Sequence, residues 1–212
     1  MLDGLQLACA PGEVCAVLGE NGAGKSTLLR VLCGMLEPER GSVLIQGHEL
    51  TGGGVAARRH LGYVPDGTES LPDLSLREFV ALVRSLKQLP VDAAAELELA
   101  SRRERLGLEQ AWHQRLATLS FGQRKRACLL AALLGDPWLL ILDEPSNGLD
   151  PSGVAKVLEL IAERQARDQA TLLATNDLAF TRQLAAALGS ALHCQRLRDG
   201  QLLLESHRIT ER

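Results

Sequence analysis

The sequence predicts an α/β fold with a mainly parallel sheet. Short apolar segments alternate with segments of helical periodicity along most of the 212 residues, and this alternation is typical of sheets covered by helices. The segment Trp138–Leu142 is apolar at every position, which indicates an interior strand buried on both faces. Near the end of the chain, Leu192–Leu197 and Gln201–Leu204 flank the turn Arg198-Asp199-Gly200. We therefore expect a hairpin that adds a small antiparallel part.

The other elements are delimited by glycine, proline and changes of periodicity. Val14–Leu18 is followed by glycine and then by a helical pattern, which predicts a strand, a loop and a helix over residues 24–33. Further strands are expected at Val43–Gln46, Leu61–Val64 and Ala170–Thr175, and further helices over residues 121–134, 154–167 and 178–188.

One interval differs in composition and periodicity from the rest of the chain. From Ser75 to Gln123 the patterns are helical, charged and rich in arginine, with almost no strand signal. We interpret this interval as part of a helical lobe inserted into the sheet domain. The chain is thus predicted to form one domain, 1–212, in which residues 1–74 and 135–212 make the core and residues 75–134 make the lobe.

The composition excludes several classes of protein. Hydrophobic residues make up 46% of the chain and charged residues 23%, with a net charge of −3, which is ordinary for a globular protein. No dense basic run is present, so we expect no nucleic-acid partner. Apolar stretches such as Ala127–Leu134 are too short to span a bilayer, and Met1–Ala10 lacks the basic flank of a secretion signal. We expect a cytoplasmic protein, with any membrane role supplied by a partner.

The cysteines favour a reducing compartment. Their number is odd and their spacing is scattered, without a Cys-x-x-Cys pair, so we expect reduced thiols rather than a metal or redox site. They are Cys9, Cys15, Cys33, Cys128 and Cys194.

A phosphate-binding loop follows the first predicted strand. The segment reads Gly19-Glu20-Asn21-Gly22-Ala23-Gly24-Lys25-Ser26-Thr27 and matches the Walker A pattern G-x-x-x-x-G-K-[ST]. Its glycines let backbone N–H groups turn toward a polyphosphate, and the following helix directs its positive end at the same anion. We expect Lys25 to reach the β- and γ-phosphates and Ser26 to ligate Mg²⁺. The loop therefore predicts a binding site for ATP with Mg²⁺.

Two acidic residues follow the interior strand at Trp138–Leu142. The strand brings Asp143 to its carboxyl end, where open α/β sheets bind ligands. There Asp143 is expected to hold the magnesium ion, and Glu144 to polarise the attacking water.

A third motif, Leu119-Ser120-Phe121-Gly122-Gln123, stands between these two, and here the sequence resembles the ABC ATPase family. The resemblance covers nearly the whole chain. It includes the loop at Gly19–Thr27, this signature after a helical lobe, the acidic strand, and Ser146–Pro151, which looks like the family's D-loop with its Asp150. Four such motifs in this order are highly specific. The resemblance implies a RecA-like core with an inserted signature lobe.

The resemblance also implies partners. Two such domains meet head to tail, as a homodimer or a heterodimer, so that Ser120 and the Gly122 backbone close on ATP held by the other protomer. Phe121 replaces the family's usual first glycine, and little loss is expected from this. The lobe would dock on a membrane-spanning transporter subunit, which implies a peripheral location at the cytoplasmic face of the inner or plasma membrane. The transported substrate and the direction of transport are not predicted.

Three departures from the family pattern affect the expected chemistry. Asp66 stands in place of a glutamine; it can still ligate the metal but adds negative charge near the phosphates. Asn176 stands in place of the switch histidine. Removing a transition-state donor costs ~3–4 kcal/mol and neutral hydrogen bonds are about half as strong as charged ones, so this replacement is expected to slow turnover by roughly ten- to thirtyfold. Residues 1–18 contain no aromatic to stack on adenine, which predicts weak nucleotide affinity unless another side chain substitutes.

These departures leave alternative functions open. The leading hypothesis is a subunit that hydrolyses ATP, slowly, to energise transport. The alternative is a degenerate subunit that binds ATP as a regulatory partner of an active ABC ATPase; the departures favour it, whereas the retained Glu144, Lys25 and Ser120 oppose it. A soluble ABC ATPase acting on DNA or ribosomes is less favoured, because Phe79–Thr118 is far too short for the long coiled coil of the chromosome type.

Overall fold

A computed structural model describes residues 2–50, 54–67 and 71–204. Within these ranges six strands form the main sheet, in the order β4 (Leu61–Val64), β5 (Leu139–Asp143), β6 (Ala170–Thr175), β1 (Val14–Leu18), β7 (Leu192–Arg198) and β8 (Gln201–Leu204). Neighbouring strands are parallel except β7 and β8. A separate antiparallel pair joins β2 (Leu44–Ile45) to β3 (His48–Glu49). The expected α/β fold with a mainly parallel sheet is confirmed.

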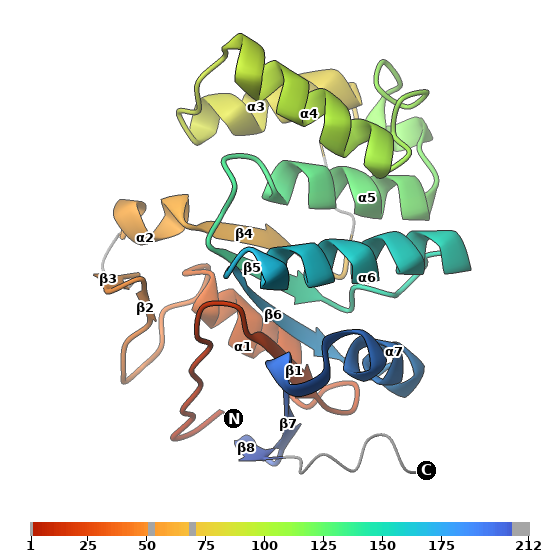
Figure 1. The fold of residues 1–212 in the computed structure, drawn as a ribbon. Coiled ribbons are helices and arrows are strands. Elements are labelled where there is room, and N and C mark those ends of the chain that lie inside the picture. The colour runs from red at the N-terminus through yellow and green to blue at the C-terminus, as the bar shows by residue number, and fades with distance from the viewer. Residues whose placement is uncertain (1, 51–53, 68–70, 205–212) are drawn as a thin grey trace.

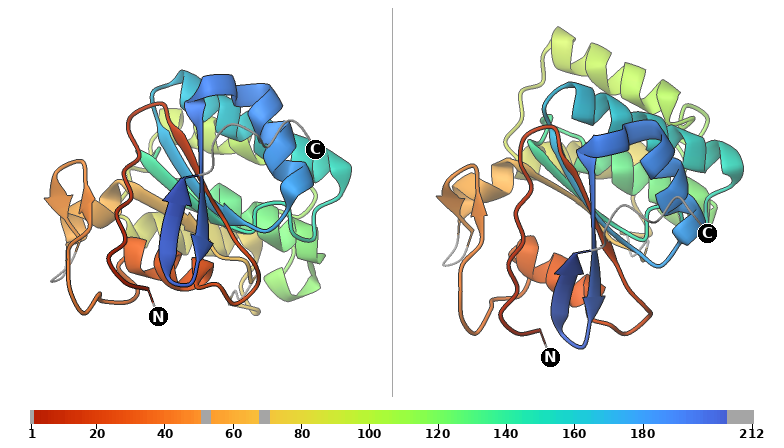
Figure 2. Two further views of the ribbon diagram at one scale, coloured as in Figure 1. Left: turned by 90° about the horizontal axis from the view of Figure 1, so that it is seen from below. Right: turned by 60° about the horizontal axis from the view of Figure 1, so that its bottom comes forward.

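Helices cover this sheet and build one end of the molecule. Those in the described ranges are α1 (Lys25–Leu32), α2 (Val55–Arg59), α3 (Leu76–Leu86), α4 (Ala93–Arg105), α5 (Phe121–Ala132), α6 (Pro151–Ala166) and α7 (Leu178–Leu188), with 3-10 turns at Leu116–Thr118 and Gly189–Ala191. Figures 1 and 2 show α3 and α4 beyond α5, at the end opposite the β7–β8 hairpin. None of these helices is long and apolar enough to cross a membrane.

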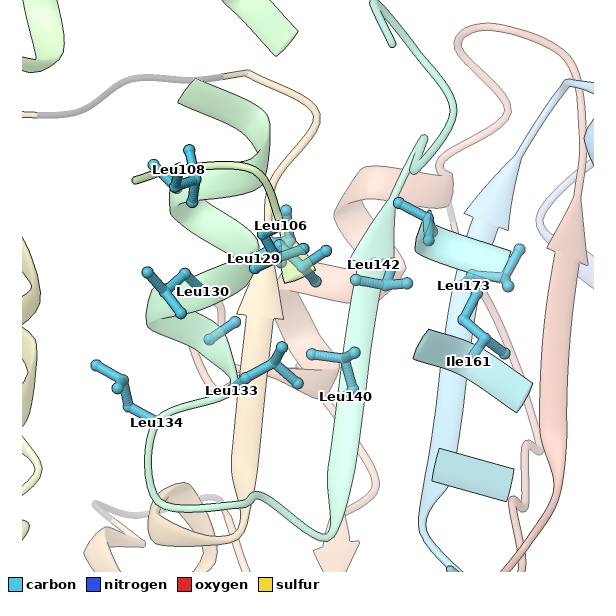
Figure 3. Packing of buried hydrophobic residues seen from close by; sticks show 14 of the residues in the cluster. Leu106, Leu108, Leu129, Leu130, Leu133, Leu134, Leu140, Leu142, Ile161 and Leu173 are labelled. Atoms are coloured by element: carbon cyan, nitrogen blue, oxygen red, sulfur yellow. The ribbon is translucent and has the colours of Figure 1, made fainter. Parts of the chain in front are cut away.

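Leucines of α5 and β5 lie at the centre of the larger apolar cluster. Leu129 of α5 and Leu133, which caps this helix, lie beside Leu140 and Leu142 of β5 (Figure 3), and none of the four is more than 3% exposed. Burying one such side chain contributes roughly 1.5–3 kcal/mol. This packing fixes the helix that begins within the signature motif against the strand that ends at Asp143.

The outer helix α4 is held differently, because Leu99 is its buried residue and the rest of its surface is largely polar. Arg102 of α4 donates to the carbonyl of Leu133 and to Asp136. Arg84 of α3 donates to the Pro90 carbonyl at 2.7 Å and also pairs with Glu96 of α4. Hydrogen bonds from cationic side chains therefore supplement a small apolar contact.

Several predicted boundaries are corrected by the structure. The helix expected from residue 154 begins at Pro151, because the Asp150 carboxylate accepts a hydrogen bond from the Gly153 N–H and proline suits the first helical position. The strand expected at Val43–Gln46 is reduced to β2, since Gln46 has a positive φ of 50°. The division into core and lobe stays a prediction, and residues 1, 51–53, 68–70 and 205–212 lie outside the described ranges.

All five cysteines are free thiols, of which Cys15 and Cys33 are buried. Cys9 and Cys15 lie close to Glu13, yet each thiol already donates to a backbone carbonyl. The Cys9 Sγ is 3.6 Å from the Glu13 oxygen, and the Cys15 Sγ is 3.5 Å from the Ala8 oxygen. Both thiols are therefore satisfied as neutral donors.

Candidate nucleotide-binding site

The glycine-rich loop joins β1 to α1 and depends on glycine backbone geometry. Gly24 caps α1 with a φ of 101°, and Gly22 has a φ of 83°, a region that side chains disfavour. Lys25 is only 6% exposed. Its Nζ donates to the carbonyl oxygens of Gly19 at 2.8 Å and Glu20 at 3.2 Å. The lysine is thus held by the loop that contains it.

A second contact of Lys25 reaches the end of β5. Its Nζ lies 3.2 Å from the Glu144 Oε1 in a largely buried ion pair. The Oε2 of Glu144 accepts hydrogen bonds from the Thr175 hydroxyl at 2.8 Å and from the Asn176 N–H at 3.2 Å. Both partners come from the end of β6, so this carboxylate is held by the end of β6 and by the first residue of α1. Glu144 itself has a φ of 45°, in the left-handed region.

Asp143 ends β5 and is almost completely buried, at 2% exposed. Burial raises the pKa of its carboxyl; Asp66 and Glu144 add to the rise, while a hydrogen bond with Ser26 and the charge of Lys125 oppose it. Within the described part of the chain its Oδ1 has no hydrogen-bond partner. A buried oxygen of this kind is costly unless something binds it.

Asn176 and Asp66, the two departures, contact different neighbours. The Asn176 Nδ2 donates to the Asn21 Oδ1 at 2.8 Å, which links the end of β6 to the phosphate loop. Asp66 accepts from the Asn147 Nδ2 at 2.9 Å and lies 3.7 Å from the Lys125 Nζ. The structure therefore places Asn176 at the loop, and Asp66 between α5 and the segment after β5.

The signature motif lies apart from this group, at the start of α5. Ser120 caps the helix: its Oγ accepts from the Gln123 N–H at 3.2 Å, and its own N–H donates to the Gln123 side chain at 2.8 Å. Phe121 lies over the backbone of Gly148 so closely that a Cβ added there would overlap its ring. Asp150 caps α6 in the same region, and hydrogen bonds from Gly153 and Ser152 lower its pKa.

Sequence reasoning did not single out Lys125, which is 3% exposed. Its Nζ donates to the carbonyls of Asp143 at 3.0 Å, Asp66 at 3.2 Å and Pro65 at 3.2 Å. A lysine next to the buried face of a helix was the available signal, but its acceptors lie 18 to 60 residues away in the sequence.

The strand order, the glycine loop at the end of β1 and the acidic end of β5 define a P-loop nucleotide-binding protein. A sequence model described as "ABC transporter" matches residues 2–147, and the chain belongs to this family. A second model, described as "AAA domain, putative AbiEii toxin, Type IV TA system", matches residues 103–209. The chain is an ABC ATPase, a transporter subunit that binds and hydrolyses ATP, as the resemblance in its motifs implied.

Individual relatives agree with this assignment. The chain is 36% identical over 161 residues to the uncharacterized ABC transporter ATP-binding protein YhcH of Bacillus subtilis, spanning 74% of the chain and 50% of that protein. It is 36% identical over 194 residues to the lipoprotein-releasing system ATP-binding protein LolD of Pseudomonas fluorescens, spanning 89% and 85%. A solved "ATP binding subunit of ABC transporter" superimposes with a TM-score of 0.85 at 30% identity, covering 95% and 81%.

Proposed function

We propose that the chain is one of two ABC ATPase protomers that close on ATP and Mg²⁺ and so drive a membrane-spanning transporter subunit. The observation that supports this proposal is the separation of two half-sites. Lys25, Asp143 and Glu144 meet at the strand ends, whereas Ser120 stands at the start of α5 with its hydroxyl turned to its own helix. A second protomer, identical or different, supplies the opposite half of each site.

The residues at the end of β5 fit a magnesium ion. The buried Asp143 Oδ1 lacks a partner in the described ranges, and Ser26 hydrogen-bonds the same carboxylate. Hard oxygen ligands of this kind suit Mg²⁺, which when bound neutralises charge on the phosphates. We assign Asp143 and Ser26 as ligands. Asp66 is the less available candidate, since its Oδ1 already accepts a hydrogen bond from Asn147.

ATP binding must exchange the partners of Lys25. In the structure the ammonium is held by Gly19, Glu20 and Glu144. The β- and γ-phosphates, cradled by the backbone N–H groups of the loop from Gly19 to Thr27, compete for the same ammonium. When Lys25 moves to the phosphates, Glu144 loses its ion pair. Binding thus frees the group that hydrolysis needs.

The freed Glu144 is held in place for the chemical step. The Thr175 hydroxyl and the Asn176 N–H still anchor its Oε2, which leaves Oε1 to accept a hydrogen bond from the attacking water. That water attacks the γ-phosphorus as ADP departs, and closure by Ser120 and Gly122 of the second protomer excludes other water. Asn176 contributes a neutral amide at the loop, and slow turnover stays a prediction.

The transport role places the chain against a membrane partner. We assign the docking function to the helical part around α3 and α4, which leaves the nucleotide loops free for the second protomer. LolD, the relative quoted above, is named for a lipoprotein-releasing system. The chain accordingly works at the cytoplasmic face of the membrane, and the membrane-spanning partner selects the cargo.

Replacing Glu144 with glutamine tests the proposal. Glu144→Gln keeps the shape of the side chain but removes the base, so ATP hydrolysis should fall by ~10²–10⁴-fold while ATP binding persists. Because closure no longer leads to hydrolysis, an ATP-bound pair of protomers should accumulate and elute as a dimer in size-exclusion chromatography. Phosphate release and elution volume with and without ATP are the measurements.

The matched control is Glu159→Gln, an exposed glutamate on α6, which should change neither property. A regulatory subunit without hydrolysis of its own would show the same low phosphate release before and after Glu144→Gln, and would contradict the hydrolytic role. Absence of an ATP-dependent dimer in every variant would contradict the two-protomer site.

A further inference from the structure

Lys125 is a buried cation whose three N–H donors are all used outside its own helix. Its Nζ donates to the carbonyl oxygens of Pro65, Asp66 and Asp143, at 3.2, 3.2 and 3.0 Å. An ammonium group has three donors and no acceptor, so this arrangement satisfies the side chain completely. Removing a lysine from water is costly unless such partners are present, and neighbouring buried positions of α5 hold alanine and leucine instead.

The positive charge of Lys125 is balanced by the carboxylate of Asp66. The Asp66 Oδ1 lies 3.7 Å from the ammonium and also accepts from the Asn147 Nδ2 at 2.9 Å. Burial lowers the pKa of Lys125, whereas the charges of Asp66 and Asp143 raise it. The sequence predicts that Asp66 adds negative charge near the phosphates. In the structure, that charge faces a cation from the signature helix.

The elements that Lys125 joins belong to different parts of the proposed reaction. It stands in α5, about one turn after Ser120, which faces the second protomer's ATP. Its acceptors are the backbone of Asp143, next to the catalytic Glu144, and the Pro65-Asp66 segment after β4. A shift of α5 on dimer closure must therefore strain or move the backbone at Asp143 and at Asp66.

We propose that Lys125 is a positioning residue that couples the signature helix to the backbone of Asp143 and Asp66. The inference rests on the proposed function. It adds a physical connection between the signature helix and the acidic residues, which belong to different motifs. The three donors of Lys125 are bound to backbone carbonyls, and this residue acts by fixing where Asp143 and Glu144 stand when Ser120 of the other protomer closes.

A second lysine provides the matched control. Lys87 also donates to two carbonyls, those of Ala132 and Leu134, at 3.4 and 3.0 Å. These acceptors lie at the far end of α5, so Lys87 makes the same kind of bond without reaching the nucleotide loops. Any effect common to both lysines is structural, and any effect confined to Lys125 reflects coupling.

The experiment compares Lys125→Met with Lys87→Met in the full chain. Groups that hold ligand-bearing residues typically change activity by ~10–100-fold when removed, so kcat of Lys125→Met should fall by that factor with KM for ATP little changed. Lys87→Met should lower the melting temperature but leave kcat near that of the unchanged chain. Hydrogen exchange without nucleotide should quicken at residues 61–66 in Lys125→Met alone.

A second variant keeps the test decisive if Lys125→Met folds poorly. Lys125→Gln retains hydrogen-bond donors without the charge and should recover part of kcat. Equal losses of kcat in Lys125→Met and Lys87→Met, or unchanged kcat and exchange in Lys125→Met, would overturn the coupling role. If Glu144→Gln abolishes hydrolysis while kcat of Lys125→Met equals that of the unchanged chain, this inference fails and the proposed function stands. If Glu144→Gln has no effect, the proposed function itself fails.

Discussion

The centre of the sheet and the outer helix α4 are held in place by different forces. Every residue of β1 and β6 is buried, so these strands are fixed by apolar area, which is large in sum and non-directional. Helix α4 buries Leu99 and is also joined to its surroundings by polar contacts, among them those of Arg102 and the Arg84–Glu96 pair. The hydrogen bonds and ion pairs that hold α4 are few, and each contributes only modestly to stability. The comparison teaches that the nucleotide loops stand on a rigid base, while the outer helix can adjust to a partner at lower cost.

The largest expected effect is a loss of stability on substitution in the sheet. Leu173 in β6 is 0% exposed, and Leu173→Ala should lower the free energy of unfolding by ~2–5 kcal/mol through lost burial and a residual cavity. Urea titration followed by circular dichroism measures it. Leu97 of α4 is 74% exposed, so Leu97→Ala should stay within about 0.5 kcal/mol of the unchanged chain. Equal losses would contradict the comparison.

An intermediate effect is expected at the outer helix. Arg102→Met removes the donors to the Leu133 carbonyl and to Asp136, and should cost ~1–3 kcal/mol, largely as local opening. Hydrogen exchange should therefore quicken in α4 and not in β6. Arg105, whose pair with Glu163 is exposed, is the control, and Arg105→Met should cost less than ~1 kcal/mol. Faster exchange in β6 would show that the helix and the sheet unfold as one unit.

The smallest effect is expected at the start of α3 when the pH is lowered. Hydrogen bonds from the Ser75 hydroxyl and N–H hold the pKa of Glu78 below its usual 4.5. The contribution of Glu78 to the cap is therefore fully present above pH 4.5 and is lost only as the pH falls through its lower folded-state pKa. Exchange at the first turn of α3 should rise in that acidic range. Glu78→Gln should remove this pH dependence, and an unchanged profile would contradict the role of the cap.

Local patterns allowed much of the fold to be predicted. The strand, glycine loop and helix around Lys25 follow from a motif whose glycines and apolar run lie within a few residues of one another, and α7 matches its predicted bounds. The predicted start of α6 is three residues late. Asp150 and Pro151 form the cap and first position of this helix, but in the sequence their pattern indicates only the D-loop.

The long-range contacts of the candidate site could not be predicted in the same way. That Lys25 would pair with Glu144, or that Lys125 would reach Pro65 and Asp143, depends on how α5 packs on β5 and on which strand ends become neighbours. No spacing in the sequence contains this information, since parallel strands bring together residues from distant parts of the chain.

The contact between Phe121 and Gly148 limits how this sequence can change. Gly148 has a φ of 69° and its missing side chain leaves the space that the Phe121 ring fills. A larger residue at position 148 would overlap that ring and would also have to adopt a positive φ that side chains disfavour. Chains descended from this one should therefore keep glycine at position 148, because a smaller residue at position 121 would remove the overlap but not the backbone strain.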